Sequence, residues 1–203
     1  SINPFNNWAN HLNLFVVDKI GDQPLPLSRL FAKSVLKFAA CSCASFSNDE
    51  EWVKPFGLRL FKPFQNLIFM PGNIKSHDCC FFDEEIGLKV SVFENSNEVV
   101  IAFGAIGSGH TELSEDRNKA VTERQAETVQ ANLLGRTPGL YEEASKVVSF
   151  LMRSPSLAGK KMAVCGQSFG GSIAEYVGLS LRIDAYCFNA VLLGAGLSRR
   201  IPE

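Results

Sequence analysis

The sequence contains no apolar run of about 18 residues, the length that a membrane-spanning helix needs. It also has no positively charged start followed by an apolar stretch, so we expect no signal peptide. Neither sign of charge is in excess, because 20 basic residues face 21 acidic ones and the formal net charge is −1. Nucleic-acid-binding proteins usually carry a basic patch. These absences predict a protein without an integral membrane segment and without a nucleic-acid partner.

Cysteines at metal-ligand spacing are also missing, although the chain has six cysteines. The segment His-Asp-Cys-Cys at 77–80 has no second cluster to accompany it, so we predict no metal site and no cofactor. Cys165 and Cys187 lie in apolar runs typical of buried strands, where cysteine packs as a small hydrophobic residue. We therefore expect free thiols in a reducing compartment. That compartment is the cytoplasm, or a host cytosol if the protein is a secreted effector.

Residues 1–85 differ in pattern from the rest of the chain. The apolar run 27–44 has helical spacing and predicts a buried helix. The segment 56–69 is rich in phenylalanine, which either packs in a core or lines a pocket for acyl chains. We interpret residues 1–85 as a helical, phenylalanine-rich segment and a candidate cap over a site. The sequence starts at Ser1 without a methionine, which is one reason to expect a piece of a longer protein.

From residue 86 to residue 203 the pattern becomes regular. Residues 88–94 alternate apolar and polar side chains, as a half-buried strand does, and the apolar run 98–103 is typical of an interior strand. Further elements are predicted as helices at about 112–134, 139–153 and 169–181, and as strands at 160–165 and 185–193. The first of these helices has as its expected inner positions Ala120, Val121, Ala126, Val129 and Leu133. This alternation predicts an α/β domain with a mostly parallel central sheet and flanking helices.

The segment Gly166-Gln167-Ser168-Phe169-Gly170 matches the pattern G-x-S-x-G. In this pattern the serine occupies a sharp, strained turn between a strand and a helix, and small residues flank it because strand end and helix start approach closely. We expect Ser168 to be a nucleophile and Gly166 and Gly170 to form the turn. The N–H of Phe169 would then donate to the oxyanion of the reaction. The alternatives are a tight turn with a capping serine and a phosphate-binding loop.

The sequence around this motif resembles the fungal-type (class 3) lipase family, over about residues 86 to 196. The resemblance rests on the segment Val-Val-Ile-Ala-Phe-Gly-Ala-Ile at 99–106, the helix 139–153, the motif 166–171 and the strand 187–193. It implies a partial α/β-hydrolase fold and a serine ester hydrolase that acts on a lipid or acyl ester through an acyl-Ser168 intermediate. In that family the first strand ends in Ala-Phe-Arg-Gly-Thr, so Ile106 takes the oxyanion position and donates its backbone N–H.

The resemblance does not identify a general base in this chain. Family members carry an acid and then a histidine after the nucleophile, but residues 169–203 contain no histidine. Asp184 precedes its strand, at the wrong end of the sheet. Three explanations stay open. In the first, the chain is a fragment whose last strands lie outside it. In the second, His110 in the glycine-rich loop 104–110 is an unconventional base, although such a histidine is more often a solvated loop residue. In the third, the domain is an inactive hydrolase-fold module that binds a partner, as part of a larger effector protein.

Overall fold

The structure is a computed structural model that describes residues 15–16, 25–26, 29–47, 49–63, 65, 70, 72–105, 115–191 and 193–201. The chain divides into two compact units, residues 1–36 and residues 37–203. In the first unit, β1 (Phe15–Val16) pairs with β2 (Leu25–Pro26) in an antiparallel ladder. Helix α2 (Arg29–Ser47) begins in the first unit and ends in the second. This confirms the helix predicted in the apolar run 27–44.

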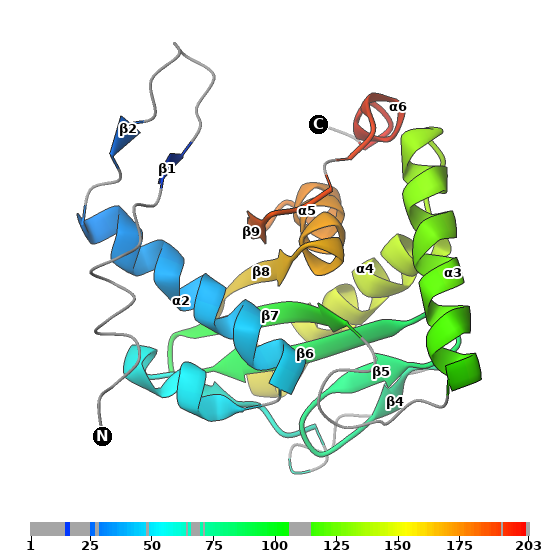
Figure 1. Ribbon diagram of the computed structural model, residues 1–203. Coiled ribbons are helices and arrows are strands. Elements are labelled where there is room, and N and C mark those ends of the chain that lie inside the picture. The colour runs from blue at the N-terminus through cyan, green and yellow to red at the C-terminus, as the bar shows by residue number, and fades with distance from the viewer. Residues whose placement is uncertain are drawn as a thin grey trace. The chain divides into compact units, whose positions relative to one another are not determined.

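The second unit is built on a seven-stranded sheet (Figure 1). Its strands are β3 (Arg59–Leu60), β4 (Lys75–Ser76), β5 (Phe81–Asp83), β6 (Leu88–Glu94), β7 (Glu98–Ala105), β8 (Lys161–Gln167) and β9 (Asp184–Phe188). They lie in the order β4-β5-β6-β7-β8-β9, and β3 pairs with β6. Four of the six described pairings in this sheet are antiparallel, and only β7–β8 and β8–β9 are parallel. The α/β class is therefore confirmed, whereas a mostly parallel sheet is not.

The connections between strands explain these directions. A parallel neighbour needs a crossover of about a dozen residues or more, whereas a short turn can join only antiparallel strands. Three residues, 95–97, join β6 to β7, and Asn95 Oδ1 accepts hydrogen bonds from the N–H groups of Asn97 (2.8 Å) and Glu98 (2.9 Å). The parallel pairs are joined through the long helices α3 (Glu115–Leu133), α4 (Gly139–Met152) and α5 (Phe169–Leu181). Shorter helical elements are η1 (Glu50–Trp52), η2 (Lys54–Phe56), η3 (Pro155–Leu157) and α6 (Ala195–Ser198).

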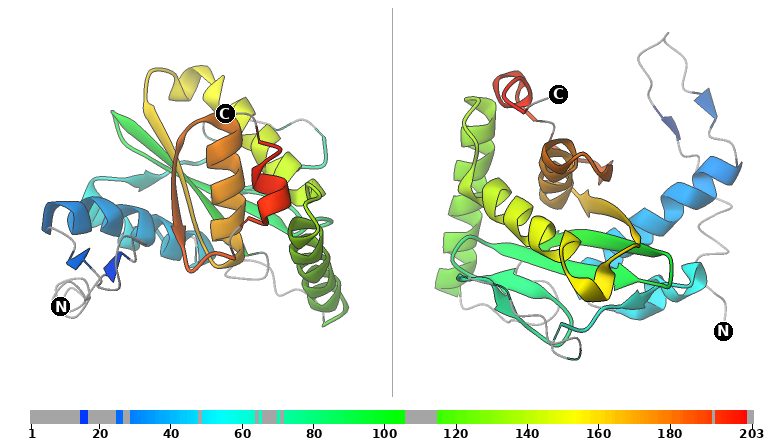
Figure 2. Two further views of the ribbon diagram at one scale, coloured as in Figure 1. Left: turned by 90° about the horizontal axis from the view of Figure 1, so that it is seen from above. Right: turned by 180° about the vertical axis from the view of Figure 1, so that it is seen from behind.

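Helices cover both faces of this sheet (Figure 2). On one face α4 and α5 pack in an apolar cluster that includes Phe103 of β7, Tyr141 of α4 and Ile173 of α5. Phe61, from the phenylalanine-rich segment, belongs to the same cluster. The second half of α2, residues 37–47, covers the opposite face, where the Phe46 carbonyl accepts a hydrogen bond from Lys89 Nζ (3.3 Å). Strand β7, which leads to the predicted site, is thereby buried from both sides.

Strand β6 is buried on both faces, so the prediction of a half-buried strand is wrong. All seven of its residues are buried, including the polar Lys89, Ser91 and Glu94. Glu94 accepts hydrogen bonds from Lys160 Nζ (2.5 Å) and Arg59 Nη2 (3.0 Å). Charged side chains are rarely buried unless they are paired, and both charged residues of β6 have partners. Lys89 and Ser91 lie on the face that α2 covers and Glu94 lies on the other face, so the polar positions of this strand do not mark a face exposed to water.

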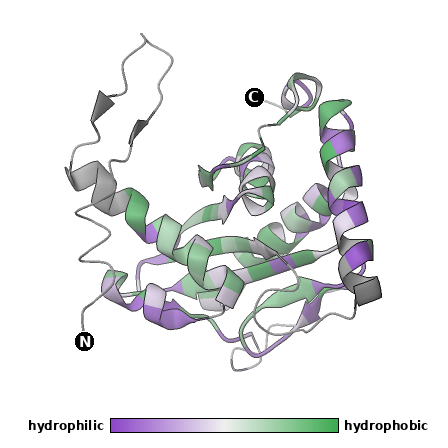
Figure 3. Ribbon diagram, in the orientation of Figure 1, coloured by the Kyte–Doolittle hydropathy of each residue, from purple (hydrophilic) through white to green (hydrophobic). Residues whose placement is uncertain are grey.

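Helix α3 buries a different face from the predicted one. Ala120 and Ala126 are exposed and Leu133 is 66% exposed, whereas Thr128 and Asn132 are buried. Figure 3 shows hydrophilic residues along this helix. Its end is held by polar contacts, since Asn132 Oδ1 accepts a hydrogen bond from the Gly194 N–H (2.9 Å) just before α6. Of the other two predicted inner positions, Val129 is half-buried, and the side chain of Val121 lies outside the described residues. The prediction for the packed side of α3 is therefore wrong at Ala120, Ala126 and Leu133.

Strand β9 is shorter and more exposed than the predicted strand 185–193. It is the last strand in the order of the described sheet, so one of its edges has no described neighbour. Cys187 in β9 is accordingly exposed, which corrects the prediction that it is buried, whereas Cys165 in the interior strand β8 is buried as predicted. All six cysteines are free thiols, as expected.

Candidate active site

Ser168 lies in the turn between β8 and α5, at the carboxyl end of the parallel strands. Its backbone angles are φ 54° and ψ −118°, a region that residues other than glycine rarely adopt. Such a conformation costs about 1–3 kcal/mol and persists only where the surroundings enforce it. The residue is exposed, and its side chain makes no capping hydrogen bond to α5. Ser168 is therefore not the helix-capping serine of one alternative interpretation.

Three glycines around Ser168 are required by close approaches of the backbone. An ideal β-carbon on Gly166 would lie 2.2 Å from the carbonyl oxygen of Gly170, and one on Gly170 would lie 2.2 Å from the carbonyl oxygen of Phe103. A β-carbon on Gly171 would lie 2.9 Å from Cβ of Ala190. Any larger residue at these positions would have to push strand and helix apart.

Hydrogen bonds hold the Ser168 backbone from both sides. Its N–H donates to the carbonyl of Phe188 at the end of β9 (2.8 Å), and its own carbonyl accepts from the N–H groups of Gly171 (3.0 Å) and Ser172 (3.3 Å). Ser172 Oγ in turn donates to the carbonyl of Val191 (2.7 Å). The turn is thus tied to β9 and to the segment that follows it, which explains how the strained conformation is maintained.

The predicted oxyanion donors lie on α5 and after β7. Phe169 is the first residue of α5, where a backbone N–H has no acceptor within the helix and where the helix dipole favours negative charge. The register pairs Phe103 with Gly166, and its continuation brings Ala105, the last residue of β7, level with Ser168. The chain therefore leaves β7 beside the serine. Ile106, the second predicted donor, follows directly but lies outside the described residues.

The structure does not bring a described base to Ser168. His110, the candidate base, lies outside the described residues. His77 lies in the hairpin between β4 and β5, and β5 is three strands from β8, which corresponds to about 14 Å at about 4.8 Å per strand. Asp184 begins β9 at the level of Ala163, four residues before the end of the β8 register, which is about 13 Å along the strand. Its carboxylate pairs with Lys161 (3.0 Å), at the edge of the sheet where the sequence placed it.

Two titratable groups behind the turn were missed in the sequence because each looks like an ordinary helix residue. Burial raises the pKa of Glu175, and the hydrogen bond that its carboxylate accepts from the Leu193 N–H (3.2 Å) acts in the opposite direction. Burial raises the pKa of Tyr141 to about 12, although a hydrogen bond with Ser172 lowers it. Tyr141 thus contacts Ser172, which holds the turn, whereas Glu175 holds Leu193 in the segment after β9.

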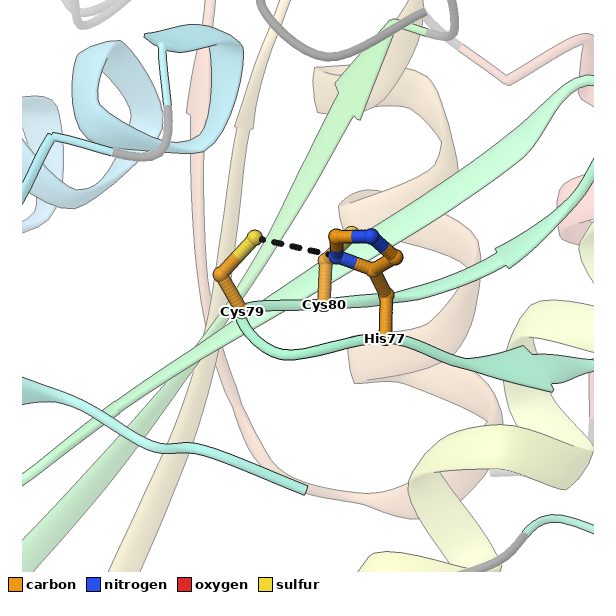
Figure 4. A group of neighbouring side chains, drawn as sticks. All are labelled: His77, Cys79 and Cys80. Atoms are coloured by element: carbon orange, nitrogen blue, oxygen red, sulfur yellow. Dashed lines mark hydrogen bonds between the residues drawn. The ribbon is translucent and has the colours of Figure 1, made fainter. Parts of the chain in front are cut away.

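A second group of reactive side chains lies in the hairpin between β4 and β5 (Figure 4). Among the described residues, His77, Cys79 and Cys80 form the only trio of potential metal ligands whose ligand atoms lie close together, all within 4.8 Å of one another. Their position, three strands away from β8, separates them from Ser168.

No model of a known protein family and no curated protein matches this chain. The resemblance to class 3 lipases therefore rests on the motifs alone. No helix in the part of the chain that the structure describes is long and apolar enough to cross a membrane. Fold and site together define an α/β protein with an exposed serine held in a strained turn between a parallel strand and a helix.

Proposed function

We propose that the protein is a serine ester hydrolase of the lipase or phospholipase kind, with a lipid or acyl ester as substrate. The conformation of Ser168 carries this proposal. The serine is exposed, is not used as a helix cap and is held at a positive φ by glycines that admit no side chain. Strain of this kind is concentrated at functional sites, because elsewhere nothing offsets its cost.

The proposed reaction proceeds through an acyl-enzyme. Ser168 Oγ attacks the ester carbonyl carbon while a base takes the hydroxyl proton. The N–H groups of Phe169 and Ile106 donate to the oxyanion of the tetrahedral intermediate. The alcohol leaves with a proton, and water then hydrolyses the acyl-Ser168 ester. His110 is the candidate base, since the described His77 and Asp184 are too distant.

The fold that accompanies this proposal is a partial α/β-hydrolase fold. Three observations support it: the parallel strands β7, β8 and β9, the helices α4 and α5 packed on one face, and the serine at the carboxyl end of the middle parallel strand. Open sheets of this kind bind ligands beyond the carboxyl ends of their strands. The antiparallel strands β3 to β6 extend the sheet on the side away from β9.

The second candidate function is a catalytically inactive hydrolase-fold module that binds a protein partner. It is favoured by one observation, the distance of the described His77 and Asp184 from the serine. A serine without a base is a poor nucleophile. Such a module would keep the turn as a structural feature and would lack turnover.

Labelling with a fluorophosphonate probe distinguishes these two functions, because the probe reacts with activated serines rather than with every exposed one. The wild-type chain is compared with Ser168→Ala and with Ser198→Ala, which removes an exposed hydroxyl in α6. We expect intact mass to show one adduct in the wild type and in Ser198→Ala, and none in Ser168→Ala. A folded wild-type chain that is not labelled contradicts a hydrolase that is active within these 203 residues and favours the binding module. Labelling that persists in His110→Ala excludes His110 as the base.

A further inference from the structure

The hairpin between β4 and β5 gathers three metal-ligating groups outside the proposed active site (Figure 4). The N–H of His77 donates to the carbonyl of Cys80 (2.8 Å) and so closes the turn on itself. Both thiol sulfurs and one imidazole nitrogen then lie within 4.8 Å of one another. We propose that this hairpin is a zinc-binding site whose protein ligands are Cys79, Cys80 and His77.

The distances fit a tetrahedral ion. Zinc–sulfur bonds of about 2.3 Å and zinc–nitrogen bonds of about 2.0–2.1 Å correspond to S···N separations of about 3.6 Å and S···S separations of about 3.8 Å. Cys79 Sγ lies 3.6 Å from His77 Nδ1, and no separation in the trio exceeds 4.8 Å. The ligand atoms would therefore close by at most about 1 Å around the ion, which side-chain rotation can supply.

Neighbouring side chains already orient these ligands. The His77 ring meets the Phe82 ring edge-on, with centroids 6.2 Å apart, and Lys75 Nζ lies 5.8 Å from the centroid of the same Phe82 ring. Cys80 is buried, so its sulfur has a fixed position. Residues that hold a ligand in place before the ion arrives raise the affinity of a metal site.

The chemistry of the donor set points to zinc. Soft thiolates combined with an imidazole are the ligands that Zn²⁺ takes in proteins, and hard cations such as Mg²⁺ prefer oxygen. Two thiolates and a neutral imidazole also balance the charge of the ion.

Three protein ligands leave the fourth tetrahedral position open. His77 is exposed and Cys79 is half-buried, so this position faces solvent and would hold a water molecule. The sequence pattern predicts no metal site, because the adjacent cysteines lack the usual spacing of zinc ligands. The hairpin makes that spacing unnecessary, since it folds His77 back onto the two thiols.

Metal titration of the reduced chain tests this site. Zn²⁺ is titrated against a chromogenic chelator, and Co²⁺ serves as a second probe because thiolate-to-cobalt charge-transfer absorption reports sulfur ligands. We expect the wild-type chain to bind one equivalent and to show that absorption. Cys79→Ser and His77→Gln should weaken zinc binding by more than about a hundredfold, which exceeds the usual cost of losing an outer-shell partner. Circular dichroism confirms that each variant is folded.

Cys187→Ser is the matched control, since it removes an exposed thiol from a different strand. Its zinc affinity should equal that of the wild type. The proposal is overturned if the wild-type chain does not compete with the chelator, if Cys79→Ser binds as tightly as the wild type, or if Cys187→Ser loses binding to the same extent. None of these readouts depends on hydrolase activity, so failure here leaves the acyl-Ser168 proposal unaffected.

Discussion

Gly170 and Phe103 meet so closely that an ideal β-carbon on the glycine would lie 2.2 Å from the phenylalanine carbonyl oxygen. The contact joins the first turn of α5 to the end of β7, the strand from which the predicted oxyanion loop departs. The position of the nucleophile and the position of that loop are therefore coupled through backbone atoms alone.

This contact predicts a large effect of a single methyl group. Gly170→Ala should lower the free energy of unfolding by about 3 kcal/mol, the upper part of the range for overpacked sites, because backbone cannot rotate away. Gly139→Ala, at the start of α4 where a β-carbon would meet nothing within 4 Å, is the control. It should change stability by less than about 1 kcal/mol. Urea denaturation measures both, and equal losses would show that the close contact is not real.

The strained backbone of Ser168 predicts that the usual preference for alanine over glycine in a helix is reversed at this position. Ser168→Gly should be more stable than Ser168→Ala by about 1 kcal/mol, because glycine adopts a positive φ without steric cost. At Ser149, inside α4, the order should be opposite, and glycine should be less stable than alanine by about 1 kcal/mol. Thermal or chemical denaturation of the four variants decides the matter. Alanine favoured at both sites would mean that Ser168 is unstrained.

The buried carboxylate of Glu94 should matter more than an exposed one. Glu94→Gln weakens the charged hydrogen bonds with Lys160 and Arg59, and we expect a loss of about 2 kcal/mol in the free energy of unfolding. Glu143→Gln removes an exposed pair with Lys146 within α4 and should cost less than about 0.5 kcal/mol. Similar losses in the two variants would contradict the assignment of Glu94 to a buried, paired position.

Glu175 should make stability depend on pH. Burial raises its pKa in the folded chain above the ordinary value of 4.5, so the folded state holds the proton more tightly than the unfolded chain does. The stability that this proton provides is present at low pH and is lost as pH rises through the folded-state pKa. The free energy of unfolding of the wild type, relative to Glu175→Gln, should therefore fall as pH rises above 4.5. Parallel pH curves for the two proteins would rule out the raised pKa.

The helices and strands that the sequence predicted correctly are those encoded by patterns of neighbouring residues. Strand β6 and helix α5 have the predicted bounds, because alternation, helical spacing and glycine turns act over a few neighbouring residues. Burial depends on distant partners and was harder to predict. Glu94 pairs with Lys160, 66 residues further along the chain, and no local sequence pattern near either residue indicates this ion pair.

The two candidate sites also differ in how far local sequence predicts them. The turn at Ser168 is encoded by glycines within three residues of it, so the sequence indicates where the serine lies. The zinc ligands depend on a closed hairpin that no spacing rule describes. Exposure of Cys187 could not be predicted either, because the pattern of a strand does not say whether it lies at an edge.

The second half of α2 limits how the chain can be divided for expression. A fragment that started at residue 86, where the sequence pattern becomes regular, would lose this helix together with β3 and β5. Lys89 and Ser91 would then be uncovered on a sheet face that also carries Phe93. A fragment that starts at Lys37 keeps the cover and corresponds to a compact unit. A fragment intended for crystallisation or NMR should therefore keep residues 37–47 together with the sheet that they cover.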